Sequence, residues 1–387
     1  MKKVVFVINN LEIGGVQISL LNLIREIYNF FDITVLTFYY KKEYELLLPK
    51  NVKLIHLNSP IKYLGVSQNQ LKNKPLKYCT RAFWATLTKI FGRSFITKFM
   101  FIFQKKIGYY DYAISYLHEG GKKIFYGGCN EFVIKKIKAD KKVAWIHCDF
   151  KLSGGNNNIS RKIYKKFDSI IACSNGTKKT FLECFPEFKG KCIAIRNCID
   201  YEKIKCCTKS KPIYDCSDFN IVTIARLAGE KGIERAIYAI EECLKKGFKV
   251  KYHIIGTGIM ESLLKEYVDK NQLGDYIIFY GSQSNPYQFL LGANLFLLTS
   301  YHEAAPMVFD EAAFLKVPIL ATNTISTEEM LIKTKYGIVC DNNQEGINST
   351  LLYILENPQI LDEIKQNLNN SSFTNEFIVN SFCKLFK

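Results

Sequence analysis

Patterns typical of buried strands and of helices alternate along almost the whole chain, in two series. In the first series, short apolar runs predict strands and a longer periodic run predicts a helix. The strands are expected at residues 3–8, 33–38, 52–57, 112–116, 142–147 and 169–173, and the helix at 16–28. Such alternation is typical of a parallel sheet with helices on both faces, so the predicted fold class is α/β.

A second series follows a polar, aperiodic stretch at 201–219, which we interpret as an interdomain linker. It predicts strands at 220–225, 250–255, 276–280, 295–298 and 318–321, and helices at 232–246, 260–270, 307–316 and, briefly, from 286. A chain of 387 residues, 48% of them apolar, is long enough for two cores. We expect two Rossmann-like domains, at 1–200 and 220–370, and a C-terminal helix within 371–387.

Neither the cysteines nor the apolar opening of the chain indicates export. The thirteen cysteines are odd in number and form no Cys-x-x-Cys pair, so we expect free thiols and no bound metal. The apolar run at the start is interrupted by Asn9, Asn10 and Glu12, and no small-residue cleavage site follows it. No uninterrupted run of about 18 apolar residues occurs. We therefore expect a cytoplasmic protein without a membrane span.

The formal net charge of +17 is concentrated in residues 1–200, and above all in residues 61–110, which contain no acidic residue. Aromatic residues are interleaved with the lysines there, which predicts a basic helical segment. The segment could bind an anionic membrane surface, bind nucleic acid, or be a solvated insertion. With no nucleic-acid recognition motif, the membrane is favoured and no nucleic acid is expected. The residues expected to contact it are Lys72, Lys74, Lys77, Arg81, Trp84, Lys89, Phe91 and Arg93.

Two loops at the carboxyl ends of second-series strands have residues suited to a phosphorylated ligand. Arg226 and Lys231 flank a helix N-terminus, where backbone amides and the helix dipole favour anions. Gly256 and Gly258 would let the backbone approach a ligand closely, although a tight turn is the simpler reading. Position at a strand end favours a diphosphate site for the two cations.

Carboxylates, a glycine pair and a histidine complete the candidates. Glu303 lies on a loop and Glu311 in the helix after it, so one ligand could meet both, the first through sugar hydroxyls and the second through a ribose diol. Gly14 and Gly15 precede a helix and offer amides to an anion, with an ordinary loop as the alternative. His147 ends the strand at 142–147, where it is either a site residue or structural.

Together these motifs resemble the family-four class of retaining glycosyltransferases (glycosyl transferases group 1), which have the GT-B fold. The resemblance extends over nearly the whole chain and is strongest over residues 221–323. It is carried by Ile-Val-Thr-Ile-Ala-Arg-Leu-Ala-Gly-Glu-Lys-Gly, His-Ile-Ile-Gly-Thr-Gly and the pair Glu303 and Glu311, in that order. It implies two Rossmann-like domains facing a cleft and a C-terminal helix that crosses back to the first domain.

The resemblance also implies roles for particular residues. Catalytic roles fall to His147, Arg226, Lys231 and Glu303, of which the two cations bind the donor diphosphate and Glu303 the transferred sugar. Donor binding falls to Gly14, Gly15, Gly256, Gly258, Pro306, Met307 and Glu311. Ala304, where the family usually has glycine, and the sequence at 324–327 depart from the family pattern and bear on donor identity.

The implied activity is that of a hexosyltransferase-type glycosyltransferase (EC 2.4 class). It would move a sugar from a UDP- or GDP-sugar, with retention, to a lipid-linked or other saccharide acceptor in bacterial surface polysaccharide synthesis. No Asp-x-Asp occurs, so we expect no metal and no cofactor. We expect a location on the inner face of the cell membrane. The alternatives are a nucleotide-sugar epimerase of the same fold and a non-catalytic relative that binds membrane or nucleic acid.

Overall fold

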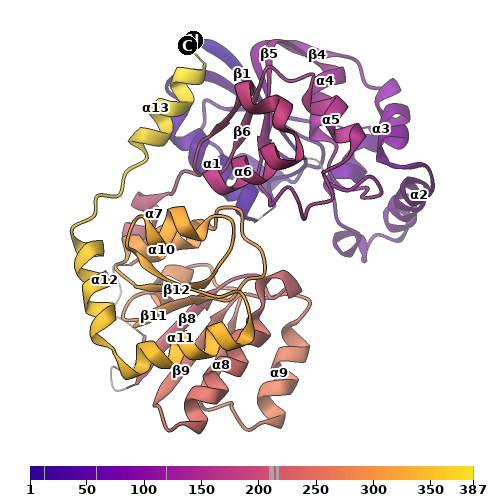
Figure 1. Ribbon diagram of the computed structural model, residues 1–387. Coiled ribbons are helices and arrows are strands. Elements are labelled where there is room, and N and C mark those ends of the chain that lie inside the picture. Colours follow the sequence, from indigo (N-terminus) through magenta and orange to yellow (C-terminus); the bar gives the residue numbers. More distant parts are fainter. Residues whose placement is uncertain (13, 58, 119, 209–212, 215–217, 387) are drawn as a thin grey trace. The chain divides into compact units, whose positions relative to one another are not determined.

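The computed structural model describes residues 1–12, 14–57, 59–118, 120–208, 213–214 and 218–386. Its contacts divide the chain into two units, the first formed by Met1–Cys198 and Asn375–Lys387 and the second by Ile199–Thr374. Each unit is built on one parallel sheet flanked by helices (Figure 1). The predicted α/β class with two Rossmann-like domains is confirmed.

The first unit has a seven-stranded parallel sheet in the order β3-β2-β1-β4-β5-β6-β7. Its strands are β1 Lys2–Ile8, β2 Phe31–Thr37, β3 Lys53–His56, β4 Ile107–Ser115, β5 Ile137–Ile146, β6 Ser169–Ala172 and β7 Cys192–Ala194. Successive side chains of the central strand β1 enter two different cores, Val5 with one and Val4 and Phe6 with the other. Because both faces of the strand are buried, its sequence is a continuous apolar run.

Helices cover both faces of this sheet. They are α1 Gly15–Ile27, α2 Pro75–Phe91, α3 Arg93–Ile102, α4 Cys129–Lys136, α5 Asn158–Tyr164, α6 Asn175–Cys184 and α13 Glu376–Leu385, with 3-10 turns at Lys42–Leu47, Pro60–Gly65, Asn69–Leu71 and Pro186–Lys191. In α13, the Phe382 ring lies 6.2 Å from that of Phe6 and 5.8 Å from that of Phe31. The expectation that the C-terminal helix returns to the first domain is therefore confirmed.

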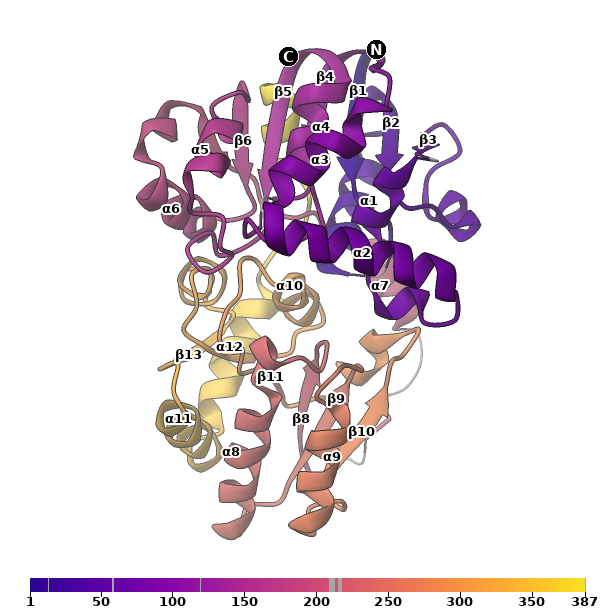
Figure 2. The ribbon, with the colours of Figure 1, turned by 90° about the vertical axis from the view of Figure 1, so that its right-hand side faces the viewer.

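The basic segment at 61–110 is only partly helical. Two 3-10 turns precede α2, and Gly92, with φ of 83°, separates α2 from α3 because this backbone conformation suits glycine. Figure 2 shows α2 and α3 at the front of the first unit. The end of the segment belongs to β4, which begins at Ile107 and so makes the helical prediction wrong there. The strand predicted at 112–116 is the second half of β4, and the first half was missed because its exposed glycine and tyrosine interrupt the apolar pattern.

The second unit has a six-stranded parallel sheet in the order β10-β9-β8-β11-β12-β13. Its strands are β8 Phe219–Ile224, β9 Val250–Ile255, β10 Ile277–Gly281, β11 Leu295–Leu298, β12 Ile319–Thr322 and β13 Gly337–Cys340. Its helices are α7 Tyr201–Cys207, α8 Ile233–Lys245, α9 Glu261–Lys270, α10 Met307–Phe314, α11 Gln344–Glu356 and α12 Gln359–Asn369, with short turns at Gly229–Lys231, Pro286–Phe289 and Glu328–Ile332. One core joins both faces of the sheet.

The linker predicted at 201–219 begins instead with helix α7, so that prediction is wrong for its first part; residues 209–212 and 215–217 lie outside the described residues. The Asp200 carboxylate accepts from the Lys203 backbone amide at 3.0 Å and caps the helix, and Ile204 is fully buried in the core of the second unit. One buried side chain in seven is too weak a pattern to predict. The second unit accordingly begins at Ile199.

Candidate functional site

Each sheet reverses its strand order at one point, between β1 and β4 in the first unit and between β8 and β11 in the second. In parallel α/β sheets, ligands bind beside the carboxyl ends of the strands at such a reversal. Gly14, Arg226, Lys231 and Glu303, which were selected from the sequence, lie on loops at these two places.

In the second unit, the loop after β8 is fixed to the end of β11. Gly232 has φ of 58°, and a Cβ atom there would lie 2.4 Å from the Thr299 carbonyl oxygen. The Thr299 hydroxyl donates to the Gly232 carbonyl at 2.7 Å. Only glycine fits this contact, which sets the place where α8 begins.

Lys231 and Glu303, predicted from sequence as site residues, are in contact. The Lys231 Nζ lies 2.6 Å from Glu303 Oε1, and the two side chains are 22% and 10% exposed. The Ser300 hydroxyl donates to the same carboxylate oxygen at 2.7 Å. A cation from the β8 loop and a hydroxyl from the end of β11 thus hold this carboxylate at the strand reversal. Ser300 was not predicted, although it follows a predicted strand closely.

Arg226 is more exposed than Lys231 and has a different partner. Its guanidinium forms an ion pair with Glu230 four residues along, and its side chain is 69% exposed. Each predicted phosphate-binding cation is therefore neutralised by its own carboxylate.

Glu311 lies on α10, the helix that follows the Glu303 loop with Pro306 at its N-cap and Met307 as its first residue. The Tyr287 hydroxyl donates to Glu311 Oε1 at 3.4 Å. Burial raises the pKa of the Glu311 carboxyl from 4.5 to about 7, and the Tyr287 hydrogen bond opposes that rise. Sequence reasoning missed Tyr287, which lies on another connection of the sheet.

The structure gives another reason for glycine at positions 256 and 258 than the expected close approach of the backbone to a ligand. A Cβ atom on Gly256, whose φ is 138°, would lie 1.9 Å from the Ala225 carbonyl oxygen, and one on Gly258 would lie 2.1 Å from that of Leu227. The Leu227 amide also donates to the Thr257 carbonyl at 3.0 Å. The glycines let the loops after β8 and β9 pack together. Their contact with a donor remains a prediction.

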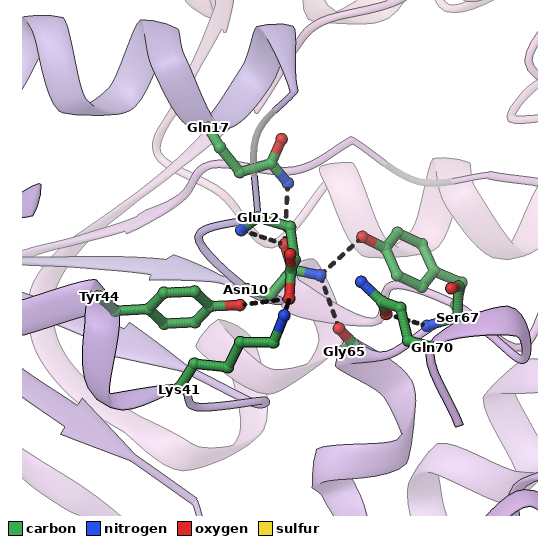
Figure 3. Close-up of polar contacts among 9 residues, drawn as sticks. Asn10, Glu12, Gln17, Lys41, Tyr44, Gly65, Ser67 and Gln70 are labelled. Atoms are coloured by element: carbon green, nitrogen blue, oxygen red, sulfur yellow. Dashed lines mark hydrogen bonds and ion pairs between the residues drawn. The ribbon is translucent and has the colours of Figure 1, made fainter. Parts of the chain in front are cut away.

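In the first unit, Asn10 organises the loop after β1 (Figure 3). Its Oδ1 accepts from the Glu12 backbone amide at 3.0 Å and from the Gln17 side chain at 3.3 Å. Its Nδ2 donates to the Gly65 carbonyl at 2.6 Å and to the Tyr126 hydroxyl at 3.1 Å. One amide therefore joins the loops that follow β1, β3 and β4.

Glu12 joins the same loop to the connection after β2 (Figure 3). Its Oε1 lies 2.6 Å from Lys41 Nζ and accepts from the Tyr44 hydroxyl at 3.1 Å. Beyond it, Gly14 is the N-cap of α1 and Gly15 its first residue, and no side chain of the described residues caps the helix. The glycine pair thus lies at the helix N-terminus, as predicted, and its contact with phosphate stays a prediction.

His147 follows β5 directly. Its ring centroid lies 4.6 Å from that of Tyr116 and 5.8 Å from that of Trp145. Its Nε2 is buried and has no hydrogen-bond partner among the described residues. Burial and the neighbouring His118 hold the pKa of His147 well below 6.5, so its imidazole is neutral at physiological pH.

His118, which sequence reasoning missed, stands at the same level of the sheet as His147. Ser115 of β4 pairs with Ala144 of β5, and each histidine lies three residues beyond its strand's member of that pair. The His118 Nδ1 is also buried without a hydrogen-bond partner in the described part of the chain. Burial and Arg93 lower the pKa of His118 to about 4. Strand pairing, which the sequence alone does not fix, brings the two together.

The residues expected at a membrane divide into two groups. Lys72, Lys74, Lys77, Lys89 and Phe91 are exposed. Arg93 is only 5% exposed, so its predicted membrane contact is wrong. Arg81 is half-buried, and its guanidinium donates to the Val66 carbonyl at 2.6 Å and to the Gln68 side-chain oxygen at 2.7 Å. The Trp84 ring is half-buried against the core of the unit.

Within the described ranges, no three His, Cys, Asp or Glu side chains come together as metal ligands would. No helix in the part of the chain that the structure describes has the length and apolarity needed to cross a bilayer.

Two Rossmann-like units and a C-terminal helix that returns to the first unit define the GT-B class of proteins. The fold is shared with HepE of Anabaena, solved in complex with UDP and glucose, at a TM-score of 0.69 and 17% identity over 100% of this chain and 99% of that one. It is also shared with the lipopolysaccharide outer core galactosyltransferase WaaB, at a TM-score of 0.62 and 17% identity over 98% of both chains. Residues 213–371, within the second unit, match the family model of the glycosyl transferases group 1.

Curated relatives match over part of their length. An uncharacterized glycosyltransferase, MJ1059 of Methanocaldococcus jannaschii, is 28% identical over 166 residues, 41% of each chain. The alpha-monoglucosyldiacylglycerol synthase of Acholeplasma laidlawii is 28% identical over 40% of this chain and 39% of its own. The N-acetylgalactosamine-N,N'-diacetylbacillosaminyl-diphospho-undecaprenol 4-alpha-N-acetylgalactosaminyltransferase of Campylobacter jejuni is 23% identical over 51% and 53%. This chain spans between two fifths and about half of these relatives.

Proposed function

We propose that the protein is a hexosyltransferase-type glycosyltransferase that transfers a sugar from a UDP- or GDP-sugar to a saccharide acceptor. The observation that carries the proposal is the contact between Lys231 and Glu303 at the strand reversal of the second unit. It lies within the residues that match the glycosyl transferases group 1 family. A cation and a carboxylate at one strand reversal suit a ligand that has both phosphate and hydroxyl groups.

The residues of this site can exchange partners when a donor binds. Lys231 and Arg226 would release Glu303 and Glu230 and turn to the diphosphate, because phosphate oxygens compete with carboxylates for the same donors. Glu303, still held by Ser300, would then accept from hydroxyls of the transferred sugar. Glu311 would accept from the ribose.

The same cations would stabilise charge on the departing phosphate, which is the largest contribution that such a site makes. The proposal therefore includes transfer without a metal, and full activity in EDTA is the expected result. It also includes retention of configuration at the transferred carbon, which a proton spectrum of the product's anomeric signal would test.

We further propose that the acceptor is lipid-linked and belongs to bacterial surface polysaccharide synthesis, with the protein bound peripherally on the inner face of the cell membrane. Two relatives are named for diacylglycerol and diphospho-undecaprenol compounds. The basic segment at 61–110, without an acidic residue, suits an anionic surface.

A melting screen against UDP, GDP and ADP and their sugars tests the donor class. A ligand at about 100 times its dissociation constant stabilises the protein by about 2.7 kcal/mol, which raises the melting temperature measurably. Stabilisation by a uridine or guanosine diphosphate that Lys231→Ala abolishes is the expected result. A wild-type protein that no nucleotide stabilises would overturn the proposal.

A further inference from the structure

Helices α2 and α3 present large apolar side chains to solvent. The side chains in question, called here the aromatic face, are Phe83, Phe91, Phe95, Phe99, Ile102 and Phe103, and each is between 47% and 69% exposed. On the other side of α3, Ile96, Met100 and Phe101 are buried in the core of the first unit. Helix α3 is therefore apolar on both sides. Packing against the core explains the buried side but leaves the exposed apolar side unexplained.

The aromatic face is continuous across the two helices. Trp84 of α2 lies 5.9 Å from Phe99 of α3, centroid to centroid, and Phe99 lies 5.9 Å from Phe103. At the junction of the helices, Phe91 and Phe95 are 5.6 Å apart. A contiguous exposed apolar surface of this kind marks an interaction site, whereas single exposed side chains do not.

Exposed lysines accompany this face, and the segment that carries it contains no acidic residue. Residues 61–110 contribute Lys72, Lys74, Lys77, Lys89 and Lys98, all exposed, and no acid. The fold adds cations that are distant in sequence, because the Arg93 amide donates to the Lys122 carbonyl at 2.8 Å where α2 meets α3. The exposed Lys122 and Lys123 therefore lie beside the junction of the two helices.

We propose that the aromatic face and its surrounding lysines dock on the surface of an anionic phospholipid bilayer. Aromatic rings enter the interfacial region while lysines reach anionic headgroups around them. The exposed lysines of the segment, which contains no acid, complement such a surface. The proposal deepens the peripheral membrane binding that forms part of the proposed function and rests on it for the lipid-linked acceptor, whereas the sugar-transfer proposal does not depend on it.

Two arginines of the segment have a different part in this proposal. Arg81 fixes α2 to the backbone at Val66, and Arg93 is buried beneath the start of α3. They hold the helices that carry the face and do not contact lipid.

Sedimentation of the full chain with vesicles tests the proposal, without nucleotide, so that its failure is distinct from failure of the glycosyltransferase proposal. The vesicles are phosphatidylcholine alone and phosphatidylcholine with phosphatidylglycerol, at low and high salt. The first variant replaces Lys72, Lys74, Lys77 and Lys89 by Gln. The second replaces Phe83, Phe91, Phe95 and Phe99 by Ser. The matched control replaces Lys162, Lys165, Lys166 and Lys179, exposed elsewhere on the same unit, by Gln.

Binding of wild type should require phosphatidylglycerol and weaken with salt. The lysine variant should bind at least about a hundredfold more weakly, since each lysine near the surface contributes about fivefold. The phenylalanine variant should lose at least about tenfold, and the control should bind nearly as wild type.

Three results would overturn the proposal. They are equal binding to both vesicle types, equal loss in the control and the lysine variant, and a lipid-free dimer that the phenylalanine variant abolishes in sedimentation velocity. The last would assign the face to a second copy of the chain. Melting curves check that each variant is folded, and the lysine variant changes only exposed side chains.

Discussion

The strand reversals of the two units are organised by different interactions. In the second unit, an ion pair between Lys231 and Glu303 joins the loops after β8 and β11. In the first, the neutral amide of Asn10 and the Tyr126 hydroxyl join the loops after β1 and β4, while an ion pair between Glu12 and Lys41 joins the loop after β1 to the connection after β2. Two neutral histidines follow β4 and β5. Under the proposed function, we expect the second unit to bind the charged donor and the first unit to bind the hydroxyl-rich acceptor.

The largest expected effect is the loss of turnover when the Lys231 ammonium is removed. We expect Lys231→Ala to lower turnover at least about a hundredfold, the scale of removing one preorganised group that stabilises developing charge. Steady-state kinetics with the donor identified by melting measures it. The control is Lys245→Ala, since Lys245 is also ion-paired, with Glu241, but lies at the far end of α8. Activity of Lys231→Ala within threefold of wild type would remove the charged site from the second unit.

Glu311→Gln should raise stability while it weakens nucleotide binding. The folded pKa of about 7 is above the ordinary 4.5, so the folded state holds the proton more tightly and loses stability as pH rises from about 4.5 through 7. The variant should therefore gain about 1 to 3 kcal/mol in free energy of unfolding near pH 8 and much less near pH 5. Urea titrations at both pH values measure this.

Nucleotide binding by Glu311→Gln shows whether Glu311 binds the donor or only packs inside the protein. If Glu311 accepts from ribose hydroxyls, nucleoside diphosphate should bind the variant more weakly by about 1.5 to 3 kcal/mol. Glu345→Gln, an exposed glutamate on α11, is the control for both measurements. A gain in stability with unchanged affinity would leave Glu311 buried for reasons unrelated to the donor.

The two histidines should affect transfer but not nucleotide binding. We expect His118→Ala and His147→Ala each to lower transfer about tenfold, the scale of one or two lost hydrogen bonds, with nucleotide affinity unchanged. His56→Ala, an exposed histidine on β3, is the control. Because both site imidazoles are neutral, neither should contribute a step to the rate between about pH 6 and pH 8. A tenfold loss of nucleotide affinity would contradict the division between the units.

The smallest effect is expected from Tyr287→Phe. Its hydroxyl holds down the pKa of Glu311 through a long hydrogen bond of 3.4 Å. Without it the pKa should rise by a fraction of a unit, and the pH at which nucleotide binding is half lost should rise equally. Calorimetry across that range measures the shift, and an unchanged midpoint would mean that the hydroxyl does not act on the carboxyl.

The sequence predicts best what local pattern controls. Strand β9 is predicted to the residue at 250–255 and β11 at 295–298, because buried parallel strands are continuous apolar runs. Strand β7, of three residues, is missed because it is too short for a pattern. Strand β13, of four, is missed because it opens with Gly337, which is needed where a Cβ atom would lie 2.1 Å from the Ile319 carbonyl oxygen.

In the site, too, local sequence predicts single residues, whereas the contacts between them depend on how the strands pair. Lys231 and Glu303 are predicted by their places after strands, yet their contact spans 72 residues and depends on β8 lying beside β11. His118 is missed because it comes close to His147 only through the pairing of β4 with β5, the strands that the two histidines follow. Arg93 is misassigned because a basic residue in a basic helix looks exposed until packing shows which side is turned inward.

Release of nucleoside diphosphate from a panel of UDP- and GDP-sugars, measured for wild type and Lys231→Ala side by side, tests whether Lys231 acts in sugar transfer. We expect wild type to release diphosphate from at least one of these sugars and the variant to do so at least about a hundredfold more slowly. Release at equal rates by both proteins, or from none of the sugars by wild type, would contradict this expectation.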